Sequence, residues 1–118
     1  MVFGHWFLGK FGVNYRNRAL ICSGDKDIAR GYVKMGTSTL IEVMPLEPFS
    51  ICFSASCLDL FGHFQFAGRE VREDPHQIRL ELERLEFVEY RNCGLDEAVA
   101  SGNEVMVYAD YFVYRSLM

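Results

Sequence analysis

The sequence predicts an all-β protein: a small barrel or compact sandwich of six to eight mostly antiparallel strands, with one short helix near the C-terminus. Three observations lead to this prediction. Apolar and polar residues alternate over short runs, turn-forming residues separate the runs, and Val, Ile, Tyr and Phe are frequent within them. With 118 residues the chain has the length of one domain, so residues 1–118 are expected to form a single β-barrel-like unit.

The first part of the chain contains five expected strands. Two aromatic segments near the N-terminus are interrupted by glycine, as at the edge of a barrel. Only Gly36 and Thr37 separate the fourth strand from the fifth, which is the length of a hairpin loop. The expected strands are 2–8, 11–15, 18–22, 28–35 and 38–44.

Residues 50–57, SICFSASC, contain two cysteines five positions apart. Apolar and small polar side chains alternate here, so a strand is expected. Cys52 and Cys57 would then point to opposite faces, about 16 Å apart and beyond the reach of a disulfide. We therefore expect Cys57 in the core and Cys52 on the other face.

Residues 75–91 allow two interpretations. Asp74 followed by Pro75 is typical of a helix N-terminus. Alternation favours a strand or bulged strand pair, because three apolar residues are separated by charged ones and no single apolar stripe forms on a helical wheel. We favour the strand. The alternating apolar residues are Ile78, Leu80 and Leu82.

Three further elements complete the predicted fold. A bulge or tight turn around 56–62 is expected to shift the phase before a strand over 64–71. A short helix is expected over 95–101, between two glycines. Residues 104–117 are apolar in both phases, which is typical of a central strand covered on both sides.

The distribution of charge is uneven. Residues 1–36 carry six Lys and Arg against two Asp, a net charge of +4, whereas residues 37–118 carry six Arg against fourteen acids, a net charge of −8. Opposite charges on one small domain favour a homodimer or higher oligomer, or binding to a protein partner. The acidic remainder argues against nucleic-acid binding.

Catalytic and metal-binding patterns are scarce. His5, His63 and His76 lie far apart in the sequence, no metal-ligand spacing occurs, and no glycine-rich phosphate loop is present. Cys57 and His63, with Asp59 nearby, form the one nucleophile–base set, and the expected bulge separates them. We therefore predict a binding or assembly module without catalytic activity, metal or cofactor; a small enzyme using Cys57 and His63 is an alternative.

The basic N-terminal third contains the candidate ligand site. Arg16 and Arg18 carry guanidinium groups that suit bidentate contacts with phosphate. Tyr15 offers a stacking face beside them, and Ser38 offers a hydroxyl from a neighbouring strand. The ligand would be an anionic nucleotide.

Residues 16–89 resemble a PilZ domain, a small β-barrel that binds cyclic di-GMP. RNR (16–18) is similar to the family's arginine element, although its arginines are two positions apart rather than four. In GTSTLI (36–41) only Ser38 matches the second element. GREV (68–71) and LERLEF (82–87) are similar to the later strands. The resemblance implies a barrel and, as an alternative function, a receptor for cyclic di-GMP or another anionic nucleotide.

The sequence also predicts a cytosolic location without membrane association. The first twelve residues, MVFGHWFLGKFG, have no basic leader or small-residue cleavage site, and apolar runs are shorter than a membrane span. Four cysteines without C-x-x-C spacing are expected to be reduced.

Overall fold

A computed structural model describes residues 2–34 and 36–117 of the chain. Its helices are α1 (Val2–Phe11), α2 (Tyr15–Arg18), α3 (Lys26–Arg30), α4 (Leu60–Gln65), α5 (Arg69–Glu73), α6 (Pro75–Arg84) and α7 (Leu95–Ala100). Its strands are β1 (Leu20–Ser23), β2 (Ile41–Pro45), β3 (Phe49–Phe53), β4 (Val88–Arg91), β5 (Glu104–Ala109) and β6 (Phe112–Ser116).

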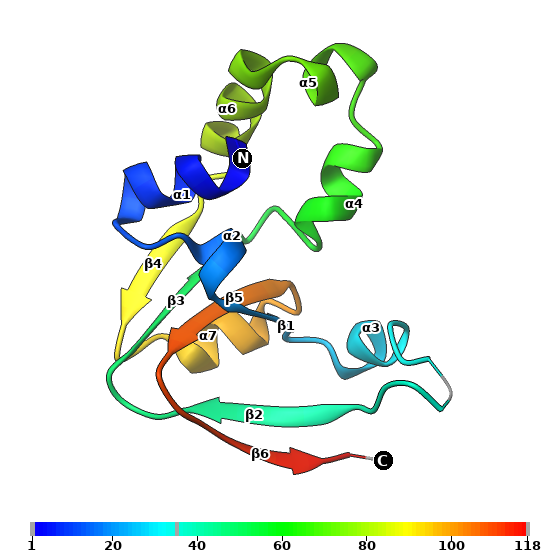
Figure 1. Ribbon diagram of the computed structural model, residues 1–118, viewed down its shortest axis with the longest axis vertical. Coiled ribbons are helices and arrows are strands. Elements are labelled where there is room, and N and C mark those ends of the chain that lie inside the picture. The colour runs from blue at the N-terminus through cyan, green and yellow to red at the C-terminus, as the bar shows by residue number, and fades with distance from the viewer. Residues whose placement is uncertain (1, 35, 118) are drawn as a thin grey trace.

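The strands form two antiparallel sheets (Figure 1). The larger sheet has the order β1-β5-β3-β4, so β3 and β5 are its central strands. The smaller sheet is a two-stranded ribbon of β2 and β6 at the other end of the molecule from α1, α5 and α6.

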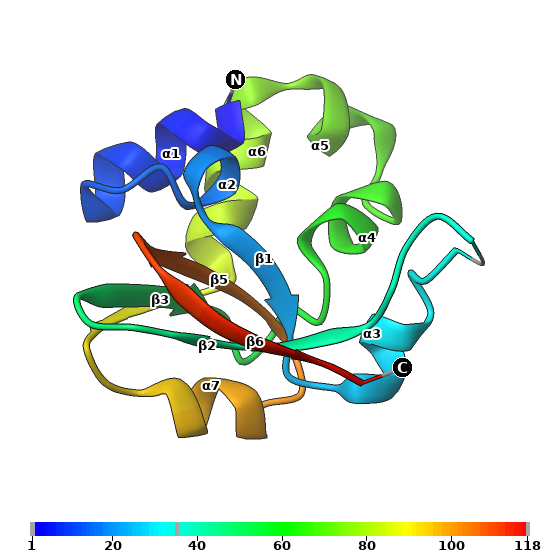
Figure 2. The same ribbon diagram turned by 60° about the horizontal axis from the view of Figure 1, so that its bottom comes forward.

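The predicted all-β barrel or sandwich is wrong. Seven helices and six strands occur in the described residues, so the fold is mixed α and β, and neither sheet closes into a barrel. The number of strands lies within the predicted range, but several segments expected to be strands are helices that cover the larger sheet (Figure 2).

The core is divided between the two faces of the larger sheet. Cys52 and Met106 point to the face that α1, α2 and α6 cover, where the larger cluster of buried side chains lies. Ile51 and Val107 point to the other face and pack with Ala98 of α7. The central strands are apolar in both phases because helices bury both faces, as predicted for the start of 104–117.

The two strands predicted at the N-terminus are wrong. Helix α1, the turn after it and the start of helix α2 occupy these residues. Phe3, Phe7 and Phe11 follow one another at intervals of four, which places them on one side of a helix. Phe7 is fully buried against Phe87, with ring centroids 5.1 Å apart. Phe87 is 80 residues away in the sequence, so this contact could not be seen locally. The local aromatic content alone predicted a strand.

Residues 75–84 form helix α6, so the favoured prediction of a strand is wrong and the helical alternative is correct. The Asp74 carboxylate accepts a hydrogen bond from the backbone N–H of His76, and Pro75 occupies the first turn. The expected alternation fails because Leu80 is 51% exposed, which leaves a single buried stripe at helical spacing. That stripe consists of Ile78, Leu82 and Leu85.

Two other predicted strands and a hairpin are also wrong. Residues 28–34 belong to the end of α3 and the turns after it, and Met35 lies outside the described residues. Residues 64–71 belong to α4, a turn and α5. Of the bulge or tight turn expected around 56–62, the structure has a tight turn, in which the N–H of Cys57 donates to the carbonyl of Ser54 at 3.3 Å, and a loop leading into α4. Strand β2 pairs with β6, not with residues 28–34.

The remaining elements agree with the sequence analysis in part. Strand β1 overlaps the strand predicted over 18–22, although Arg18 belongs to α2, and helix α7 lies within the predicted 95–101. Strand β3 ends at Phe53, so the alternation does not continue to Cys57. As a result Cys52 and Cys57 are both buried in the same core cluster, and the prediction that they face opposite sides is wrong.

No helix in the described part of the chain is both long enough and apolar enough to cross a lipid bilayer.

Candidate functional site

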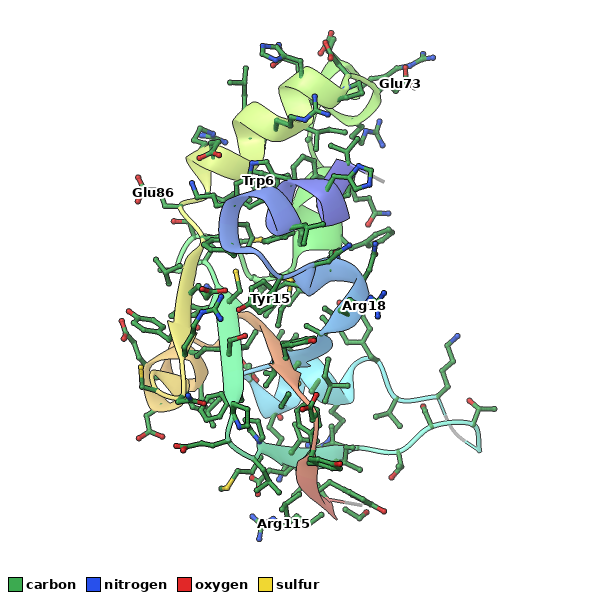
Figure 3. The ribbon with its side chains drawn as sticks, turned by 60° about the vertical axis from the view of Figure 1, so that its left-hand side comes forward. Trp6, Tyr15, Arg18, Glu73, Glu86 and Arg115 are labelled. Carbon is green, nitrogen blue, oxygen red and sulfur yellow. The ribbon has the colours of Figure 1, made fainter. Side chains whose placement is uncertain are left out.

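Tyr15, predicted to stack on a ligand, is fully buried beneath α1 (Figure 3). Its hydroxyl donates to Glu89 Oε2 at 2.5 Å and lies 2.7 Å from Ser50 Oγ, which donates in return. Burial, followed by the hydrogen bond to Glu89, raises the pKa of Tyr15 well above its ordinary value. Tyr15 therefore joins α2 to the sheet and offers no face to a ligand.

The other predicted ligand residues do not converge. Arg16 Nη1 lies 2.8 Å from Glu104 Oε1, and both side chains are largely buried. Arg18 is exposed at the end of α2. The Ser38 hydroxyl is bonded within its own turn, accepting from the backbone N–H of Lys34 at 2.5 Å. The structure does not bring Tyr15, Arg16, Arg18 and Ser38 together into one site.

Cys57 and His63 each have partners of their own. Burial raises the pKa of the Cys57 thiol to about 11, which disfavours the reactive thiolate at neutral pH. His63 Nε2 lies 2.8 Å from Glu81 Oε1 on α6. No hydrogen bond joins Cys57 to His63 in residues 2–34 and 36–117. Within the same residues, no three His, Cys, Asp or Glu side chains are grouped as metal ligands.

His63 and Glu81 instead line a cleft of about 760 Å³ between α4, α5 and α6. Arg84 forms two hydrogen bonds with Glu81, at 2.5 Å and 3.0 Å, and holds the pKa of that carboxyl below its ordinary value. Because residues 75–91 were expected to form a strand, these contacts of Glu81 were not predicted. The helical spacing of Glu81 and Arg84, three residues apart, was the available signal.

The β2–β6 ribbon carries several exposed apolar side chains. It continues the central pair of the larger sheet, because β2 runs into β3 and β5 runs into β6. Met44 pairs with Val113, and the N–H of Leu46 donates to the carbonyl of Tyr111 at 3.0 Å. Paired residues two positions apart share a face, so these four side chains lie together.

Met44, Leu46, Tyr111 and Val113 form what we call the ribbon patch. Their exposed fractions are 45% for Leu46, 55% for Val113, 60% for Met44 and 73% for Tyr111. The next pair on this face is Glu42 and Arg115, whose side chains form an ion pair at 2.8 Å. Arg115 projects away from the larger sheet and the helices (Figure 3), so the patch faces outward.

The ribbon patch was not predicted from the sequence. Residues 104–117 were interpreted as one strand covered on both sides, which is correct only for β5. Asp110 and Tyr111 separate β5 from β6, and β6 then leaves the part of the sheet that the helices cover. The signal was an apolar run longer than a strand of ordinary length.

No family model, curated protein or solved structure matches this chain.

Proposed function

We propose that this protein is a non-enzymatic assembly module that forms a homodimer through the ribbon patch. The observation that carries the proposal is the exposure of four neighbouring apolar side chains on one face of the ribbon. A two-stranded ribbon is marginal in water by itself, and contiguous apolar surface marks an interaction site. Removing the patch from water would stabilise both the ribbon and the assembly.

The accessible surface of the single chain supports association. The chain exposes 7755 Å². A folded monomer of 13.6 kDa is expected to expose about 6,600 Å², so this chain exposes roughly 1,200 Å² more. Each partner in an interface of standard size contributes about 800 Å². The excess surface is sufficient for such an interface.

The charges beside the patch favour a second copy of this chain as the partner. In a two-fold interface the same surface occurs on both sides. Each Arg115 could then face the Glu42 of the other copy, which makes the surface complementary to itself. The four side chains of the patch carry no charge, and Glu42 and Arg115 balance each other at one end of it. Glu47 and Asp110, next to Leu46 and Tyr111 in the sequence, are exposed acids at its other end.

The proposed interface differs from the one suggested by the uneven charge distribution. Lys10 lies 2.8 Å from Glu83, and Arg16 lies 2.8 Å from Glu104. Two cations of the N-terminal third are therefore neutralised by acids of the same chain. Apolar contact, with Glu42 and Arg115 aligning the copies, is the main attraction in the proposed dimer.

We also propose a cytosolic location. Cys22, Cys52, Cys57 and Cys93 are unpaired thiols, and unpaired thiols suit a reducing compartment.

Sedimentation equilibrium over a range of protein concentrations tests the dimer. We expect the wild-type protein to dimerise and Val113→Asp to be monomeric, because two aspartates would meet in the apolar centre of the interface. Val99→Asp is the matched control: it makes the same substitution at a valine that is 48% exposed on α7, compared with 55% for Val113.

Circular dichroism must show that both variants are folded. A wild-type protein that stays monomeric at several hundred micromolar would contradict the proposal, and would leave a different protein as the partner of the patch. Equal effects of Val99→Asp and Val113→Asp would contradict it as well. Glu42→Arg should weaken the dimer, and adding Arg115→Glu should restore it, because the two charges are then exchanged in both copies.

A further inference from the structure

A second cleft lies among the helices, at the opposite end of the molecule from the ribbon patch. Its volume is about 570 Å³, within the range of small-molecule sites. Residues from α1, α2, α4, α5 and α6 line it. Figure 1 shows where these five helices lie.

The floor of this cleft is apolar. Phe3 and Phe64 pack edge to face, with ring centroids 5.0 Å apart. Leu60 and Ile78 lie beside them, with 2% and 7% of their surface exposed. Phe61 is 68% exposed and lines the cleft, where its ring can cover a ligand. An apolar ligand body would be removed from water by these rings.

The charged groups that line the cleft are both cationic. Two arginines and two side-chain amides line it, and no Asp or Glu does. Arg16 donates from Nη1 to Glu104, and its other guanidinium N–H groups form no ion pair within the described residues. Arg72 forms no ion pair within the part of the chain that the structure describes, and it is exposed. The amides belong to Asn17 and Gln65.

We propose that this cleft binds a small amphiphilic anion: a molecule with a carboxylate, sulfonate or phosphate group on an apolar body. The anionic group would accept hydrogen bonds from Arg72 and Arg16, and the apolar body would lie on Phe3 and Phe64. Guanidinium groups bind planar or tetrahedral anions through paired N–H donors. The proposal is independent of the homodimer, because the cleft and the ribbon patch share no residue.

Fluorescence titration with 8-anilinonaphthalene-1-sulfonate tests the proposal, because this dye joins a sulfonate to an apolar ring system. We expect Arg72→Gln to weaken binding about tenfold, the usual effect of losing one charge-assisted contact. Arg69→Gln is the matched control, since Arg69 lies on the same helix, pairs with Glu73 and does not line the cleft. It removes the same charge and should leave binding unchanged.

Two further measurements separate this cleft from other apolar surfaces. The neutral analogue N-phenyl-1-naphthylamine should bind wild type and Arg72→Gln equally, because it has no anionic group. In two-dimensional NMR spectra the side-chain amide signals of Asn17 and Gln65 should shift on addition of the sulfonate. Val113→Asp should still bind the dye. Equal affinities of Arg72→Gln and Arg69→Gln for the dye, or unmoved amide signals, would overturn the proposal.

Discussion

The buried hydroxyl of Tyr15 allows a quantitative test of the structure. Tyr15→Phe removes one oxygen that donates to Glu89 and accepts from Ser50. A hydrogen bond to a charged group contributes about 1.5–3 kcal/mol, and Ser50 is left without its buried partner, so we expect a loss of about 2 kcal/mol. Unfolding entropy of about 2.1 cal/mol/K per residue converts this loss into a fall in Tm of about 8 °C.

Differential scanning calorimetry at neutral pH measures the change. Tyr32→Phe is the control, because the Tyr32 hydroxyl also donates to a carboxylate, that of Asp59 at 3.0 Å, but its side chain is 67% exposed. An exposed hydrogen bond competes with water, so we expect less than about 0.5 kcal/mol there. If both variants shift Tm equally, the network around Tyr15 does not stabilise the fold as argued.

Two other predictions concern α1 and the buried thiols. Gly9 lies in α1 with open space where a Cβ would be, so Gly9→Ala should raise the stability by about 0.5–1 kcal/mol in urea unfolding; a lower stability would argue against the helix. The pKa of Cys57 is raised from 9.0 to about 11 by burial, so the folded state holds this proton more tightly than the unfolded state. Stability should therefore fall between pH 9 and pH 11, by up to about 1.4 kcal/mol per pH unit for this thiol. Urea unfolding of Cys57→Ala at pH 8 and pH 10 should show a smaller fall than wild type, and an unchanged slope would contradict the argument. The fall should not vanish, because burial also raises the pKa of Cys22 to about 11.

Local signals in the sequence were sufficient for some elements. The two glycines around 95–101 bound α7, and alternation from Ser50 to Phe53 identified β3. The helical cap at Asp74 was also visible in the sequence, although the alternation beside it was given more weight. In each of these cases the residues that decide the structure lie within a few positions of one another.

Contacts between distant residues decided the other elements. Phe7 contacts Phe87, which lies 80 positions further along the chain. The aromatic N-terminal segment makes this contact as a helix, not as the predicted strand. Tyr15 and Arg16 were expected to bind a ligand, but their partners Glu89 and Glu104 are more than 70 residues away. An arginine or tyrosine suits a ligand and an internal carboxylate equally well, so residue type could not separate the two roles.

The sequence by itself determined that the chain has enough apolar residues for a core and that it lacks short catalytic motifs. It also located the elements that depend on neighbouring residues, such as α7 and β3. Only the tertiary structure decided which apolar residues are covered. Val107 and Val113 belong to the same valine-rich and tyrosine-rich run, yet Val107 is 3% exposed beneath α7 and Val113 is 55% exposed on the ribbon. Alternation of apolar and polar residues predicts that a strand has two different faces. Whether each face is buried depends on which distant element packs against it.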